Sequence, residues 1–125
     1  MARILLVEDD QATRELYEVL LKEAGHKIDS VSDGKAGFEK AVQGGYDLIL
    51  LDIMLPQMDG ITILEELKKA NAIRKNKKIV MLTTLRRDEV IKSALKLGAD
   101  GYLMKTVLKP AEVLKEVEAY LVQES

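Results

Sequence analysis

Residues 4–10 read ILLVEDD, an apolar run that passes directly into three acids. Residues 48–52 read LILLD and repeat the pattern with one acid, and two later apolar runs end at Thr83 and at Lys105. Unbroken apolar runs of about four to eight residues are typical of parallel strands that are buried on both faces. Open parallel sheets bind their ligands at the carboxyl ends of the strands. If these runs form neighbouring strands, the side chains at their ends bring several acids, a hydroxyl and an ammonium into one site.

Five apolar runs alternate along the chain with five segments of helical periodicity. Strands are expected at about residues 3–8, 27–31, 47–51, 78–82 and 101–104. Helices are expected at about residues 11–24, after Asp33 as far as Gly44, after Gly60, at 86–97 and from Pro110 onward. Regular alternation with right-handed crossovers predicts an α/β fold, a three-layer doubly wound (βα)5 domain that covers residues 1–125.

Composition excludes several classes of protein. The 125 residues are 47% hydrophobic and 32% charged, which is typical of one folded domain, and a net charge of −2 indicates no particular partner. Without cysteine there is neither a disulfide framework nor a thiolate metal site, and a cytoplasmic location is expected. The chain enters its first strand at once, and its apolar stretches are far shorter than the roughly 18 residues of a membrane span. Neither a signal peptide nor membrane contact is expected.

The first expected helix carries apolar residues at helical spacing. Ala12, Leu16, Val19 and Leu20 recur at this spacing and predict the face that packs on the core. Asp10 precedes them and is expected to be the N-cap of the helix.

Some conspicuous side chains have ordinary structural interpretations. His26, the only histidine, follows a glycine that ends a helix and is expected to be exposed in a loop. Asp59 and Asp100 each precede glycine and are most simply turn residues. Met54 and Met58 flank a proline turn and are expected to pack, since a thioether is an unsuitable metal ligand beside carboxylates.

The acids at the strand ends indicate phosphoryl chemistry. Asp52 ends a central strand, and a carboxylate there can act as a nucleophile that forms an aspartyl phosphate. Glu8 and Asp9 close to Asp52 would repel it unless a cation were present, and hard oxygen ligands suit Mg²⁺. Lys105 supplies a charge and Thr83 a hydroxyl donor for a phosphoryl oxygen. The set predicts transfer of a phosphoryl group onto Asp52.

Residues 68–78 hold six basic side chains. Such a stretch could contact nucleic acid, but no aromatic residue is interleaved to stack on bases. A solvated helix end and loop is the better interpretation, so direct nucleic-acid binding is not expected.

Four motifs together carry a resemblance to a known family: ILLVEDD, DLILLDIMLPQMDG, IVMLTT and GADGYLMK. In this order they make the chain resemble, over essentially its whole length, the receiver domain of bacterial two-component response regulators, which is chemotaxis-regulator-like and has a flavodoxin-like fold. The resemblance implies a five-stranded parallel sheet of strand order 2-1-3-4-5. It also implies Mg²⁺ as the cofactor. Asp9 and Asp52 would bind the ion directly, Met54 through its backbone carbonyl, and Glu8 through water.

The resemblance also assigns the phosphorylation cycle. Asp52 would be the phosphoacceptor, Thr83 would hydrogen-bond the phosphoryl group, Lys105 would pair with it, and Tyr102 occupies the aromatic switch position that moves with Thr83. The donor would be a phosphohistidine on a sensor histidine kinase or a phosphotransfer protein. A downstream output protein or domain would read the change of shape. Such a domain promotes its own phosphorylation and dephosphorylation and is not classed as an enzyme.

The chain departs from the family pattern after the site lysine. The family usually has a Lys-Pro peptide there, commonly cis, whereas Lys105 precedes Thr106 and the next Lys-Pro pair is Lys109-Pro110. A cis bond before a non-proline residue costs about 3 kcal/mol, so a trans Lys105-Thr106 peptide is expected. Taking Lys109 as the site lysine would break the spacing from Tyr102, and Lys105 is therefore preferred.

Two residues bear on the lifetime of the phosphorylated state. Met54 and Leu85 lie two positions after Asp52 and Thr83, where side chains border the path of the hydrolytic water in such domains. Both are apolar and cannot orient that water, so slow self-dephosphorylation is expected.

Three other functions compete with a phosphorylatable receiver. A flavodoxin-type electron carrier would need a phosphate-binding loop where the acids of residues 8–10 stand. A pseudo-receiver that only binds proteins would not need the intact acids, Thr83 and Lys105, although Thr106 leaves that alternative open. A phosphohydrolase would need a substrate-binding cap that 125 residues do not accommodate.

Overall fold

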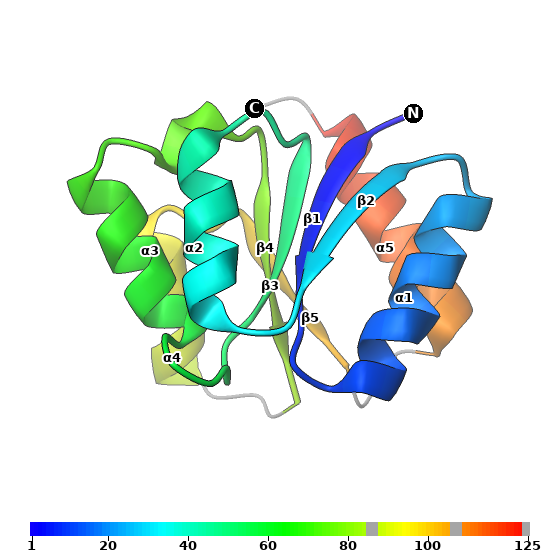
Figure 1. The fold of residues 1–125 in the computed structure, drawn as a ribbon, viewed down its shortest axis with the longest axis horizontal. Coiled ribbons are helices and arrows are strands. Elements are labelled where there is room, and N and C mark those ends of the chain that lie inside the picture. Colours follow the sequence, from blue (N-terminus) through cyan, green and yellow to red (C-terminus); the bar gives the residue numbers. More distant parts are fainter. Residues whose placement is uncertain (85–87, 106–108, 124–125) are drawn as a thin grey trace.

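The computed structural model describes residues 1–84, 88–105 and 109–123. Within them the strands form one five-stranded parallel sheet of order β2-β1-β3-β4-β5 (Figure 1). The strands are β1 (Arg3–Val7), β2 (Lys27–Val31), β3 (Leu48–Asp52), β4 (Ile79–Thr83) and β5 (Gly101–Met104). The helices are α1 (Gln11–Glu23), α2 (Gly34–Gln43), α3 (Gly60–Lys69), the short 3₁₀ helix η1 (Ile73–Lys75), α4 (Asp88–Leu97) and α5 (Pro110–Val122). The expected α/β fold and its strand order are confirmed.

Helices cover both faces of the sheet (Figure 1). Helices α2, α3 and α4 lie on one side, and α1 and α5 lie on the other. Successive strand residues point to opposite faces of the sheet. Leu5 and Val7 pack in the core under α2, α3 and α4, and Ile4 and Leu6 pack in the core under α1 and α5. This explains why the strands read as continuous apolar runs. None of the helices in the described residues has the length and apolar composition needed to cross a bilayer.

Two strands extend one residue further than the sequence predicts. β3 includes Asp52 and β4 includes Thr83, so both side chains belong to the last residue of a strand. Asp10 and Asp33 cap α1 and α2, accepting hydrogen bonds from the N–H groups of Thr13 and Ala36. The expected start of the fourth helix at residue 86 lies outside the described residues.

The predicted core face of α1 is only partly right: Leu20 packs against the core, but Ala12 is exposed. Leu16 is 43% exposed and Val19 is 52% exposed, whereas Tyr17 and Leu21 are buried against the sheet. The helix carries two adjacent apolar stripes, and helical spacing alone does not choose between them. Burying Tyr17 removes a large aromatic surface from water, which favours the observed rotation of the helix.

Three further interpretations are corrected. His26 is not an exposed loop residue: its side chain is 8% exposed, its Nδ1 accepts the N–H of Ala2 at 3.1 Å, and its Nε2 lies 3.8 Å from the Glu118 carboxylate. Met58 packs against the core, but Met54 is 69% exposed. Asp59 is more than a turn residue, because its carboxylate caps α3.

Gly34 fixes the position of the loop that follows β3. Its N–H donates to the carbonyl of Pro56 at 3.2 Å, and a Cβ at Gly34 would lie 1.6 Å from the carbonyl oxygen of Met58. Because the obstacle is backbone, Gly34→Ala is expected to lower the free energy of unfolding by about 3 kcal/mol, measured by urea denaturation. Gly25→Ala is the control, since Gly25 has a φ of +95° but nothing within 4 Å of the added Cβ, and strain alone costs about 1 kcal/mol. Equal losses in the two variants would contradict the prediction.

Candidate functional site

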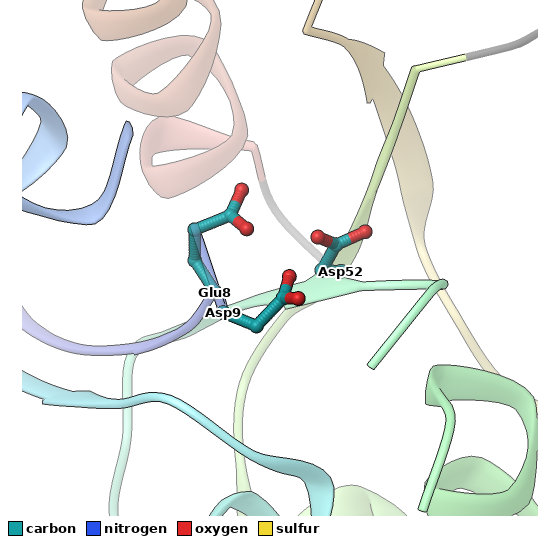
Figure 2. A group of neighbouring side chains, drawn as sticks. All are labelled: Glu8, Asp9 and Asp52. Atoms are coloured by element: carbon teal, nitrogen blue, oxygen red, sulfur yellow. The ribbon is translucent and has the colours of Figure 1, made fainter. Parts of the chain in front are cut away.

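The acids meet because β1 and β3 are neighbours in the sheet. Val7 pairs with Leu51, so Glu8 and Asp52, the next residue on each side, emerge next to each other. Figure 2 shows the carboxylates of Glu8, Asp9 and Asp52 gathered at this edge. One oxygen from each of the three lies within 4.8 Å of the others.

The three acids differ in burial and in hydrogen bonding. Glu8 is fully buried, Asp52 is 4% exposed and Asp9 is exposed. One oxygen of Glu8 accepts the N–H of Asp10 at 3.1 Å, and Oδ1 of Asp52 accepts the N–H of Met54 at 3.2 Å. Asp9 is therefore the acid most open to an incoming ion.

Lys105 joins the two buried acids. Its Nζ donates to Oε1 of Glu8 at 2.6 Å and to Oδ2 of Asp52 at 2.8 Å. Its backbone N–H donates to the carbonyl of Thr83 at 2.8 Å, which holds the residue beside β4 just past the end of β5. The structure thus places Lys105 at the acids, whereas Lys109 is exposed and precedes α5.

The surroundings of Glu8 and Lys105 shift the pKa values of these two groups. Burial raises the pKa of Glu8 above its usual range; the hydrogen bond from Lys105 opposes this effect, and the nearby Asp52 adds to it. Burial alone would lower the pKa of Lys105, but the hydrogen bonds to Asp52 and Glu8 outweigh it and raise that pKa. Burial thus makes Glu8 easier to protonate than an exposed glutamate, while the two acids hold Lys105 in its charged form.

These residues surround a cleft of about 550 Å³. Its lining comes from the ends of β1, β3, β4 and β5, from α1 and from the first residue of α5: Glu8, Asp9, Asp10, Thr13, Leu16, Tyr17, Asp52, Met54, Thr84, Lys105 and Pro110. The cleft has room for a cation and a phosphoryl group together above Asp52.

The donor set fits a hard divalent cation. Carboxylate oxygens are the ligands that Mg²⁺ prefers, and with the three acids ionised a single ammonium leaves an excess of two negative charges. Glu8, Asp9 and Asp52 could hold the ion. The expected contribution of the Met54 carbonyl stays a prediction.

Thr83 lies next to the acid cluster, whereas Tyr102 lies further back along the sheet on β5. Asp52 pairs with Leu82, so Thr83 is one residue further along β4, where it lines an adjoining apolar pocket of about 310 Å³ between α3 and α4. Tyr102 on β5 pairs with Met81 and is half-buried against the core. The two expected switch residues are therefore on neighbouring strands. The Lys105-Thr106 peptide and Leu85 lie outside the described residues.

Sequence reasoning missed two side chains at the site. Arg14, from the first turns of α1, donates from Nη1 to the carbonyls of Glu8 and Asp9, and Tyr17 lines the cleft from the next turn. The spacing of Arg14 from Asp9 is the only sequence signal for the first contact. Tyr17 was not predicted because the sequence pattern favoured a different face of α1 as the core face.

Comparisons with known proteins agree with this geometry. The family model described as "Response regulator receiver domain" matches residues 4–118. The transcriptional regulatory protein HprR of Escherichia coli K12 is 44% identical over 123 residues, covering 97% of this chain and 52% of that protein. The chemotaxis protein CheY of Treponema pallidum is 36% identical over 122 residues, covering 95% and 82%. The chain spans about half the length of the transcriptional regulators it matches.

A solved structure of a receiver domain has the same fold. The receiver domain of the sensor histidine kinase PA1611 from Pseudomonas aeruginosa PAO1 superimposes with a TM-score of 0.83 at 29% identity, covering 98% of both chains. That structure is described as having a magnesium ion coordinated in its active site cleft.

Proposed function

Because the chain belongs to the family of response regulator receiver domains, we propose that residues 1–125 form a phosphorylation-controlled switch of a two-component system, with Asp52 as phosphoacceptor. The observation that carries the proposal is the meeting of Glu8, Asp9, Asp52 and Lys105 in one cleft at the strand ends. A protein that only bound partners would gain nothing from three crowded carboxylates with one ammonium.

The proposed reaction is a displacement at phosphorus. A carboxylate oxygen of Asp52 forms a bond to phosphorus as the bond between phosphorus and the donor imidazole nitrogen breaks, and that nitrogen keeps the electron pair. Lys105 turns from the Asp52 oxygen to a phosphoryl oxygen, and the Thr83 hydroxyl donates to another. Asp9 and Asp52 would hold Mg²⁺ directly, the Met54 backbone carbonyl would be a further ligand, and Glu8 would act through water. The ion would supply positive charge that lowers the repulsion between the phosphoryl group and the carboxylates.

The proposed change of shape that a partner would recognise depends on the same contacts. Drawing Thr83 toward a phosphoryl group vacates space on the neighbouring strand, into which Tyr102 moves, and the surface formed by α4, β5 and α5 changes. A sensor histidine kinase or phosphotransfer protein is the proposed donor, and a downstream protein or domain is the proposed reader. The relation to a receiver in a sensor kinase and to transcriptional regulators supports both. A cytoplasmic location is proposed with them.

Intact mass spectrometry tests the proposal. Incubation with acetyl phosphate and Mg²⁺ is expected to add one phosphoryl group, about 80 Da, and a chelator is expected to prevent the addition. If neither acetyl phosphate nor a panel of phosphorylated histidine kinases adds mass, the protein is a pseudo-receiver that acts by binding partners.

The exposed Met54 side chain allows a test of the lifetime of the proposed phosphorylated state. Replacing Met54 with Asn or Glu places a hydrogen-bonding group at the rim of the cleft, and it is expected to speed release of phosphate about tenfold by orienting the attacking water. The decay of the phosphorylated mass peak after removal of the donor measures the rate. An unchanged or slower rate would contradict the expectation of slow self-dephosphorylation.

A further inference from the structure

We propose that Arg14 is a positioning residue for the metal-binding acids, because its guanidinium fixes the backbone that directs Asp9 into the cleft. The inference rests on the proposed function, since it assumes that a divalent cation binds at these acids. Arg14 itself touches neither the cation nor the phosphoryl group in this proposal.

The contact is made at the point where β1 stops. The ladder of β1 ends at Val7, and in the described residues no backbone N–H donates to the carbonyls of Glu8 or Asp9. Arg14 is half-buried, and its Nη1 lies 2.9 Å from the Glu8 carbonyl and 3.4 Å from the Asp9 carbonyl. The side chain therefore replaces the ladder hydrogen bonds that the strand no longer supplies.

Asp9 is the acid that depends most on this contact. Glu8 is held through its own carboxylate by Lys105 and by the Asp10 N–H. Asp52 is held by Lys105 and by the Met54 N–H. The carboxylate of Asp9 has no such hydrogen bond within the described part of the chain, so its direction is set by its backbone alone.

Charge and position predict opposite effects of removing Arg14. Its positive charge lies close to the cation site, and losing that charge alone would strengthen the binding of a divalent cation. Losing the anchor of the Asp9 backbone would weaken the binding, as removal of groups that orient metal ligands commonly costs about tenfold or more in affinity. The direction of the change in Kd therefore separates the two roles.

Calorimetric titration of the full chain with Mg²⁺ alone is the experiment. Arg14→Met is expected to raise the Kd about tenfold. Arg14→Lys keeps the charge, but its ammonium sits on a shorter side chain and lacks the planar guanidinium geometry, and an intermediate Kd is expected. Lys22→Met removes an exposed charge from the last turn of the same helix and is the control, expected to stay within about twofold of the wild type.

A kinetic measurement distinguishes a role of Arg14 in positioning Asp9 from a general disruption of the fold. At saturating Mg²⁺ the rate of phosphorylation of Arg14→Met by acetyl phosphate is expected to return to within about twofold of the wild-type rate, with only the Mg²⁺ concentration for half-maximal rate increased. An unchanged or lower Kd for Arg14→Met would overturn the inference. If that variant does not fold, a wild-type Kd in a folded Arg14→Lys would overturn it. Failure of the wild type to bind Mg²⁺ would instead count against the proposed function.

Discussion

Asp52→Asn is expected to abolish the gain of about 80 Da on incubation with acetyl phosphate and Mg²⁺. The asparagine amide has nearly the shape of the carboxylate and can still accept a hydrogen bond from Lys105, but it lacks the charged nucleophilic oxygen. Because the cluster holds three acids, two of them buried, and one ammonium, removing one acid also lowers the repulsion within it. The variant is therefore expected to remain folded, with a Tm no lower than that of the wild type.

The matched control is Asp59→Asn. Asp59 lies in the loop after β3, the strand that ends at Asp52, and caps α3, a position at which asparagine serves as well as aspartate. It is expected to take up the phosphoryl group at the wild-type rate. A mass gain in Asp52→Asn equal to that of Asp59→Asn would show that another residue is the acceptor.

Lys105→Met is expected to lower the free energy of unfolding by about 3 kcal/mol at pH 7, measured in the presence of a chelator. The substitution leaves Glu8 fully buried and Asp52 nearly so, without the ammonium that bonds to both. Methionine has a similar volume, so the loss of charge and not a cavity accounts for the effect. Phosphorylation by acetyl phosphate is expected to become slower as well, because a phosphoryl oxygen loses its partner.

The effect of Lys105→Met depends on pH in a defined direction. Burial already raises the pKa of Glu8 above its ordinary value of 4.5, and losing the Lys105 hydrogen bond raises this pKa further. The folded state then keeps a proton that the unfolded chain has released, so the free energy of unfolding falls as the pH rises above 4.5. The difference between variant and wild type is expected to be small at pH 4 and to grow toward pH 7.

Lys109→Met is the control for this series. Lys109 is exposed before α5 and is the alternative site lysine in the sequence. Its replacement is expected to change the free energy of unfolding by less than about 0.5 kcal/mol at any pH in this range. A larger effect for Lys109→Met than for Lys105→Met would contradict the placement of Lys105 at the acids.

The parts of the fold that follow from pattern were predictable from the sequence. Continuous apolar runs gave the strands, and the acids at their ends gave the cluster of Glu8, Asp9 and Asp52, because parallel strands bring their carboxyl ends to one edge. The face of α1 was not predictable, since two apolar stripes compete and only packing against the sheet chooses Tyr17 over Leu16. The contact of His26 with Ala2 was not predictable because the two residues are 24 positions apart. The contact of Arg14 with Glu8 spans only six positions, but a short spacing alone does not fix the direction of a long side chain.

The ion network has a consequence for how the protein is made. Lys105 bonds to Glu8 across 97 positions of the chain, from the end of β5 to the end of β1. During synthesis Glu8 and Asp52 therefore leave the ribosome long before Lys105. Until β5 joins the sheet, these two acids of the nascent chain are exposed to water. The network of Glu8, Asp52 and Lys105 is thus complete only once the chain has been synthesised through β5 and this strand has joined the sheet.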